Sequence, residues 1–187
     1  MKNLVIKICV FTFIFILSMS MAAFAQDPDV ENGKRSFHPE IQAGPEYDFR
    51  KTTWGMSIDE VKASEEKKPD GTGSMGKEEG VFVDYLAYFD ISLIGENSQL
   101  MYFFSKDKLI EADIHFFNDS EGERLVDKMT SIFGSPQYDN LTEDGTAHFY
   151  GWQLGNTKLV LSTYLVKKQK NTPNATLTIL DASQLEW

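Results

Sequence analysis

Two stretches of this sequence have the pattern of a capping box, in which a serine caps the start of a helix and a glutamate three residues later caps the serine in return. Ser57 and Glu60 form the first pattern, and Ser120 and Glu123 form the second. After each helix the sequence changes to an alternation of apolar and polar residues, which is typical of half-buried strands. The order is therefore helix, three strands, helix, three strands. It predicts an α+β fold of two α-β-β-β halves, with short helices packed on one face of an antiparallel sheet.

The first half is predicted to span residues 49–118. Its helix begins at Ser57 and runs to about Glu66. The segment 67–80 contains Pro69 and several glycines, so we expect a flexible loop there. The alternation then predicts strands at residues 81–93 (either one long strand or two strands bent near Ala87), 100–104 and 109–117.

The second half is predicted to span residues 119–187. Its helix carries apolar residues at helical spacing until Gly134 ends it, and Pro136 prevents its continuation. The alternation then predicts strands at residues 147–154, 158–166 and 175–180. We expect the two similar halves to form a single α+β domain over residues 49–187.

The N-terminal residues 1–25 have the features of a secretory signal peptide. Lys2 and Lys7 supply the positive region, an apolar run follows, and small alanines precede a cleavage site between Ala25 and Gln26. The alternative is an uncleaved membrane anchor, but the apolar run is short for a spanning helix. We therefore expect a periplasmic or secreted protein. Residues 26–48 are polar and interrupted by prolines and glycine, which predicts a flexible leader.

Charge and cysteine content exclude several classes of function. The sequence has 28 acidic residues against 18 lysines and arginines, a net charge of −10, so nucleic acid is not an expected partner. Its one cysteine, Cys9, lies within the signal peptide, so the processed chain has no thiol for a disulfide, a lipid anchor or a nucleophile. Nothing in the sequence indicates a cofactor. Any binding or catalytic chemistry of the processed chain must therefore come from side chains other than cysteine.

The string Trp54-Gly55-Met56-Ser57-Ile58-Asp59-Glu60-Val61 resembles the helix start of small exported bacterial domains. These include the lipoprotein subunit of the outer-membrane β-barrel assembly machinery and the β-lactamase-inhibitor-protein type of fold. The stop Gly134-Ser135-Pro136 is similar to the end of the helical region in the same families. The resemblance implies a helix-on-sheet fold and binding rather than catalysis, and it favours the periplasm. The lipid-bearing cysteine of the assembly lipoproteins is absent.

Two groups of residues are candidates for a binding site. Glu111, Asp113 and His115 alternate along one strand and could share a divalent cation, although a solvated polar face is the simpler interpretation. A second candidate is an aromatic surface for a ligand or partner, and part or all of it could instead be core. Its residues are Trp54, His148, Tyr150 and Trp152.

Motifs of catalysis and nucleotide binding are missing. The sequence has no Gly-x-Ser-x-Gly, and the glycine-rich segment 71–76 lacks the Gly-Lys-Ser/Thr of a phosphate loop. Lys167, Lys168 and Lys170 are interpreted as a solvated turn. The sequence therefore predicts an exported, non-enzymatic binding or interaction module of the bacterial cell envelope, whose partner would be an envelope protein or peptide segment. The alternative is a periplasmic protein that binds a small molecule or a metal. The oligomeric state is open, because a free strand edge would permit sheet extension.

Overall fold

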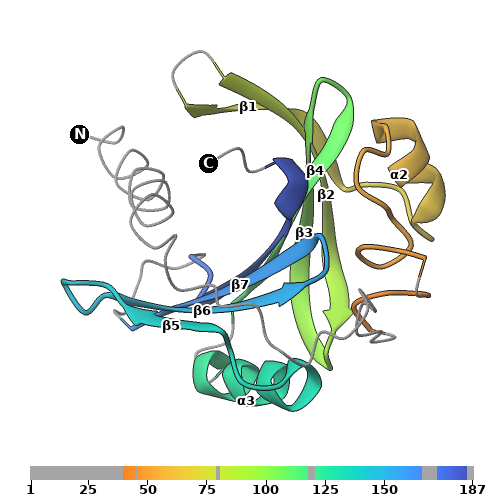
Figure 1. The fold of residues 1–187 in the computed structure, drawn as a ribbon. Helices are drawn as coiled ribbons and strands as arrows, with labels where there is room; N and C mark the ends of the chain where they lie inside the picture. The colour runs from red at the N-terminus through yellow and green to blue at the C-terminus, as the bar shows by residue number, and fades with distance from the viewer. Residues whose placement is uncertain (1–39, 45, 79–80, 118–120, 166–171, 185–187) are drawn as a thin grey trace.

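One curved, antiparallel sheet of eight strands dominates the computed structural model, which describes residues 40–44, 46–78, 81–117, 121–165 and 172–184 (Figure 1). The strand order is β1-β2-β3-β4-β8-β7-β6-β5. Two short helices complete the described part, so the fold is α+β as predicted. The strands are β1 (Gly71–Glu78), β2 (Val81–Leu93), β3 (Glu96–Ser105), β4 (Lys108–Phe116), β5 (Tyr138–Leu141), β6 (Ala147–Leu154), β7 (Thr157–Tyr164) and β8 (Ala175–Asp181). The signal peptide, residues 26–39, Ser120 and the three lysines of segment 166–171 lie outside the described residues.

The first helix, α2 (Ile58–Ser64), begins at the predicted capping box. The Ser57 hydroxyl accepts a hydrogen bond from the Glu60 amide, and Glu60 Oε2 accepts one from the Ser57 amide at 2.8 Å. A third cap comes from a distant hairpin, since the amide of Ile58 donates to Asp107 Oδ1 at 3.0 Å. These bonds satisfy donors that a helix of only seven residues cannot satisfy itself.

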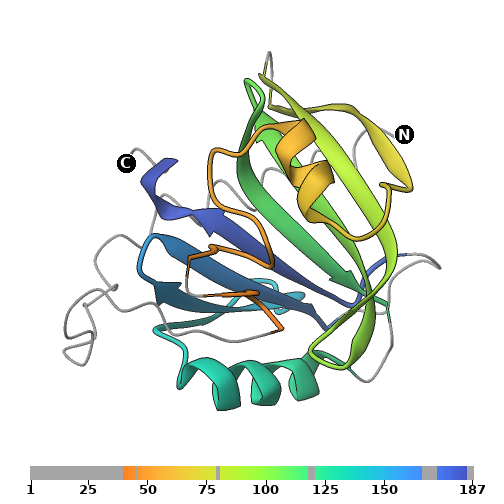
Figure 2. The same ribbon diagram turned by 90° about the vertical axis from the view of Figure 1, so that its right-hand side faces the viewer.

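The second helix, α3 (Glu121–Phe133), ends where the sequence predicts. Gly134 has φ 80°, a left-handed conformation that glycine adopts without strain, and its amide donates to Thr130 O at 2.9 Å. Figure 2 shows α3 lying across one end of the sheet, while α2 lies beside the first four strands. Leu125 and Met129 of α3 are buried in the same core cluster as Val61 of α2.

Each helix is followed by four strands, so the prediction of three strands per half is wrong. The expected loop at residues 67–80 contains β1, whose residues pair continuously with β2 from Gly71 to Gly76. Glycine at position 73 leaves room for Tyr85, because an added Cβ would lie 3.0 Å from the Tyr85 hydroxyl and that side chain would have to shift. The second missed strand, β5, has only four residues and pairs with β6.

The other predicted strands are present, mostly with small shifts at their ends, although β3 begins at Glu96, four residues before the predicted start. Residues 81–93 form one strand, and its pairing with β3 is irregular between Tyr88 and Ile91 rather than near Ala87. The tight β3–β4 turn has positive φ at Lys106 and Asp107, as in the type I′ turns that suit hairpins. The strand pair β4–β8 joins the two four-strand meanders.

Contacts also join the two halves outside the sheet. Glu96, at the start of β3, is buried and pairs with Lys128 of α3 at 2.5 Å and with Arg124 of α3 at 2.7 Å. The Lys128 ammonium also donates to Ile94 O at 2.8 Å. The helix of the second half is therefore attached to the β2–β3 turn of the first.

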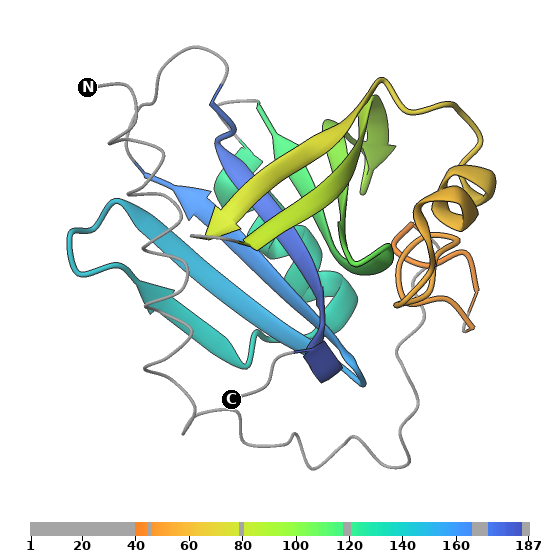
Figure 3. The same cartoon turned by 90° about the horizontal axis from the view of Figure 1, so that it is seen from above.

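Part of the predicted flexible leader is packed against the domain. Ile41 is buried in the core, and Gln42 and Asp48 are buried as well. The backbone of this segment is held because Ala43 N donates to Arg50 O at 2.6 Å and Arg50 N donates to Ile41 O. Figure 3 shows the segment before α2 on one side of the molecule and β5 on the opposite side. The packed region thus begins earlier in the sequence than residue 49.

Candidate functional site

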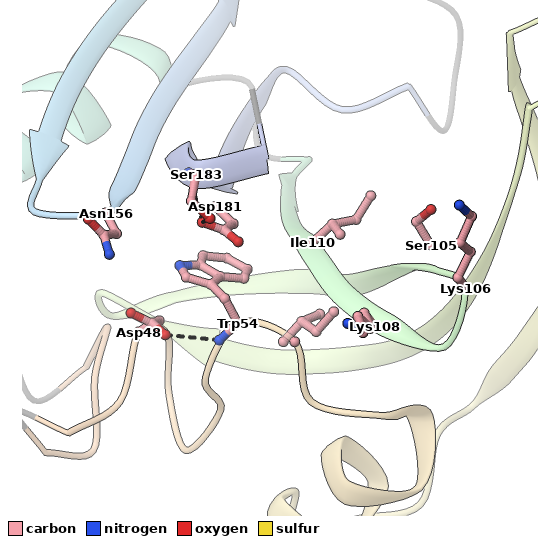
Figure 4. Close-up of a pocket in the computed structure, with 11 residues that line it drawn as sticks. Asp48, Trp54, Ser105, Lys106, Lys108, Ile110, Asn156, Asp181 and Ser183 are labelled. Carbon is pink, nitrogen blue, oxygen red and sulfur yellow. Dashed lines mark hydrogen bonds between the residues drawn. The ribbon is translucent and has the colours of Figure 1, made fainter. Parts of the chain in front are cut away.

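A cleft of about 610 Å³ lies at the end of the sheet where four parts of the chain meet. Its lining comes from the segment before α2, the β3–β4 hairpin, the β6–β7 turn and the end of β8. These parts are far apart in the sequence, and Trp54 lies among them (Figure 4). We call this site the Trp54 cleft.

Trp54 is held in the cleft by its backbone and by its indole. Its amide donates to Asp48 Oδ2 at 2.9 Å, and its Nε1 donates to Thr157 Oγ1 at 3.1 Å. The next residue, Gly55, donates its amide to Leu109 O at 2.9 Å. The indole is half-buried, so part of it remains accessible from the cleft. The string that carries the predicted helix start therefore also positions this aromatic side chain.

Two buried carboxylates stand near Trp54. Asp48 precedes it in the chain, and Asp181 lies at the end of β8. Asp181 Oδ1 accepts hydrogen bonds from the amide and the hydroxyl of Ser183, at 2.9 and 2.7 Å. The Asn156 carbonyl accepts the amide of Ala182 at 2.7 Å, so the β6–β7 turn and the end of β8 are joined. Figure 4 shows both carboxylates on the Trp54 side of the cleft.

Two exposed lysines supply the opposite charge. Lys106 and Lys108 lie at the β3–β4 hairpin and line the cleft; in Figure 4 Lys106 lies beyond Ile110, and Lys108 lies below Ile110 on the side toward Lys106. The cleft therefore has an acidic end that includes an indole face, an apolar middle and a basic end. Such an arrangement suits an occupant with a cationic group, a short apolar body and an anionic group. No histidine or cysteine is among the lining residues.

The predicted aromatic surface is divided by the fold. Trp54 contacts Thr157 at the turn end of the β6–β7 hairpin, whereas His148 pairs with Thr163 at its other end. Trp152 is only 1% exposed and donates from Nε1 to Gly134 O at 2.9 Å. The prediction that Trp152 belongs to a binding surface is therefore wrong, because its ring is used to pack the end of α3 against the sheet.

His148 and Tyr150 do lie together, with Asp139 as a third member that the sequence did not indicate. His148 Nε2 is 2.5 Å from Asp139 Oδ1, and its Nδ1 is 2.8 Å from the Tyr150 hydroxyl. The two rings are 4.3 Å apart between centroids. Burial raises the pKa of Tyr150, and the negative charges of Asp139 and Glu123 raise it further. The hydroxyl therefore stays protonated and can donate to the imidazole.

The proposed metal ligands share one side of β4. Glu111 is buried, and His115 Nδ1 lies 3.1 Å from Thr176 Oγ1 on β8. Burial lowers the pKa of His115 to about 4, so its imidazole is neutral near pH 7. Across the described ranges, no three His, Cys, Asp or Glu side chains are placed to hold a metal ion together. The geometry of Glu111, Asp113 and His115 therefore adds no support to the metal hypothesis.

Sequence reasoning found Trp54 but missed the charged residues of its cleft. Asp48 falls in the predicted leader, Lys106 and Lys108 fall at a hairpin turn, and Asp181 follows the last predicted strand. No local motif joins them, because only the folded sheet brings these parts of the chain together.

Comparisons with known proteins give one distant structural likeness. No protein-family model and no curated protein matches this sequence. A solved structure of a DUF4309 family protein, YjgB from Bacillus subtilis, is similar with a TM-score of 0.43 and 11% sequence identity, covering 80% of this chain and 95% of that chain. Within the described residues, no helix has the length and apolar character needed to cross a membrane.

Proposed function

We propose that this protein is an exported, non-enzymatic binding module of the bacterial cell envelope that holds a short segment of a partner protein in the Trp54 cleft. The observation that carries the proposal is the division of charge within that cleft. Asp48 and Asp181 stand beside an indole at one end, and Lys106 and Lys108 line the other. The predicted signal peptide supports an exported location.

A peptide segment with a basic and an acidic side chain matches this division. Its ammonium or guanidinium group would lie against the Trp54 ring and the two carboxylates, where a cation–π contact contributes about 0.5–2 kcal/mol. Its carboxylate would pair with the lysines, which are exposed and so contribute less. We expect weak binding that higher salt weakens further, because the lysines pair with the occupant in contact with water.

A small zwitterionic molecule is the second candidate occupant. The volume of about 610 Å³ lies within the range of small-molecule sites, roughly 300–1,000 Å³. A free amino acid carries the same two charges as the peptide segment but a shorter apolar body. The two occupants are therefore separable by experiment.

We also infer that both helices cover the same face of the sheet, as parts of two similar halves. Tyr102 of β3 contacts Glu65 at the end of α2, and Trp152 of β6 contacts Gly134 at the end of α3. The pairing registers place Tyr102 and Trp152 on one face, through the rows that link β3, β4, β8, β7 and β6. This arrangement supports two copies of one architecture, each with a helix followed by a meander.

The binding proposal is tested with blocked synthetic peptides and the protein purified from the producing cells. Tryptophan fluorescence should show saturable binding of acetyl-Lys-Ala-Glu-amide and none of acetyl-Ala-Ala-Ala-amide. A double variant, Lys106→Glu with Lys108→Glu, should weaken binding of the charged peptide at least about tenfold, which is about 1.4 kcal/mol. The control Lys68→Glu with Lys62→Glu makes the same change of charge away from the cleft and should leave binding unchanged.

Three results would contradict the proposal. They are equal binding of the two peptides, no binding of either, and equal weakening by the two double variants. Binding of free lysine without binding of the blocked peptides would favour the small-molecule alternative. Mass spectrometry of the exported protein should find Gln26 as the first residue, and retention of residues 1–25 would contradict the predicted cleavage.

A further inference from the structure

The outer edge of β1 has few of the features by which proteins protect a free sheet edge. Edge strands are usually short, charged, bulged or interrupted by proline, because a long regular edge invites pairing with another chain. β5, at the other end of the sheet, has only four residues and carries Asp139. β1 has eight residues, and its stretch Gly71–Gly76 contains no charge, no proline and no irregularity in its pairing with β2. In the described part of the chain, no strand pairs with its other edge.

Exposed apolar side chains gather on the same hairpin. Six large apolar side chains are exposed among the described residues, and four of them belong to β1 or β2. Phe82 is the most exposed, at 72%, and lies on the same face of the hairpin as its partner Gly76, whereas Met75, the partner of Val83, lies on the other face. Exposed apolar groups next to a free backbone edge are typical of an interaction surface.

We propose that two copies of this chain pair through their β1 edges and continue the sheet across a twofold axis at Gly73. Antiparallel pairing about that position sets Thr72 of one copy opposite Ser74 of the other. The twofold axis makes two equivalent cross-strand pairs of this kind. The Ser74 hydroxyl donates to Asp84 Oδ1 within its own copy, so in such a pair it accepts a hydrogen bond from the Thr72 hydroxyl of the other copy. The same register sets Gly71 opposite Met75, so the thioether can pack over a residue without a side chain.

The charge of the protein favours this edge as the contact between two copies, because their other, acidic surfaces repel each other. The chain has a net charge of −10, and two such molecules approach best through surfaces without charge. The stretch Gly71–Gly76 is such a surface, and pairing with itself opposes no like charges. A twofold interface needs one patch that is complementary to itself, which the alternation of Thr72 and Ser74 about Gly73 provides. Gly73 at the axis also lets the two backbones approach closely.

The oligomeric state of the exported protein tests the proposal. Sedimentation equilibrium from about 1 to 100 μM should show a monomer–dimer equilibrium for the wild type. The double variant Thr72→Lys with Ser74→Lys places lysine opposite lysine in both cross-strand pairs. It should raise the dissociation constant of the dimer at least about tenfold. The matched control adds two lysines to the opposite edge, Asn140→Lys with Leu141→Lys, and should dimerise as the wild type does. Circular dichroism and urea midpoints establish that all three proteins are folded.

A mixing experiment tests the register. Cys9, the only native cysteine, lies in the predicted signal peptide, so single cysteines can be introduced into the exported chain. A mixture of Thr72→Cys and Ser74→Cys molecules should form the mixed disulfide in preference to either symmetric one. A wild type that is monomeric at every concentration would overturn the proposal. This holds also for a monomer whose β1 edge binds a peptide of another protein. A dimer that is dissociated by the β5 variant but not by the β1 variant would also overturn it.

Discussion

Tyr102, in the middle of β3, donates its hydroxyl to Glu65 Oε1 at 2.5 Å, directly after the C-terminal turn of α2. Glu65 also receives two bonds from Arg50, from Nε at 2.9 Å and from Nη2 at 3.0 Å. Its side chain is only 3% exposed, so these three donors replace the water that a carboxylate normally binds. Burial, followed by the charge of Glu65, raises the pKa of Tyr102 well above its usual range. The hydroxyl therefore remains a donor, and α2 is attached to the sheet through a charged group.

Glu65→Gln should lower the free energy of unfolding by about 2 kcal/mol, because it removes the charge that pairs with Arg50 inside the protein. The loss stays below that of a fully buried pair, since the Arg50 side chain is 25% exposed. Urea denaturation at pH 7 measures the effect. Glu66→Gln is the matched control: this neighbouring carboxylate pairs with Lys51 in solvent, and its loss should change stability little. Equal losses in the two variants would contradict the assigned role of Glu65.

His115 should make stability depend on pH between about 4 and 6.5. Its folded pKa of about 4 is below the ordinary value of 6.5, so the unfolded chain binds the proton more readily. The stabilisation is fully present above pH 6.5, where both states are neutral, and is lost as pH falls toward 4. Wild type should therefore lose about 2 kcal/mol more than His115→Gln between pH 7 and pH 4.5.

This comparison also accounts for the carboxylates around His115. Glu111 and Asp113 share its side of β4, and the variant carries both of them as the wild type does. Their contribution therefore cancels in the difference, as long as each protein is measured at both values of pH. Identical pH dependence of the two proteins would show that burial of His115 has no thermodynamic effect.

Glu96 and Lys128 should be energetically coupled across the two halves of the fold. Glu96→Gln and Lys128→Met each break the 2.5 Å pair between β3 and α3. In a double-mutant cycle, the two losses should fail to add by about 1 kcal/mol, because the second substitution removes an interaction already lost. Lys62→Met combined with Glu96→Gln is the additive control, since Lys62 is on α2 and pairs with Asp59. Additive losses for the first pair would mean that the contact between Glu96 and Lys128 contributes no coupling free energy.

The helices and most strands could be predicted because their signals are local. The Ser57–Glu60 capping box lies within four residues, and apolar alternation along β4 identifies its two sides. β1 was missed because glycine at positions 71, 73 and 76 is typical of loops, whereas here β2 supplies the partner and Tyr85 packs over Gly73. β5 was missed because four mostly exposed residues show no alternation.

The candidate site was predictable only in part, for a related reason. Trp54 stood out because it precedes a helix start, and the His148–Tyr150 pair stood out as an aromatic strand face. Asp181 becomes a cleft residue only when β8 is inserted between β4 and β7. Long-range pairing of this kind has no signature in a single sequence, so the charge pattern of the cleft had to come from the structure.

Ile41 should contribute to stability although its segment has the composition of a leader. Its side chain is buried in the core, and its carbonyl accepts a hydrogen bond from the Arg50 amide. Ile41→Ala removes buried apolar surface and leaves a cavity, which should lower the free energy of unfolding by about 2–3 kcal/mol. Glu46→Ala, at an exposed position of the same segment, is the control and should have little effect. Because Arg50 also binds Glu65, loosening this segment should free the end of α2, and hydrogen exchange should show faster exchange at the Glu65 amide in Ile41→Ala. Unchanged stability and unchanged exchange would mean that the domain begins after this segment, as the sequence alone suggests.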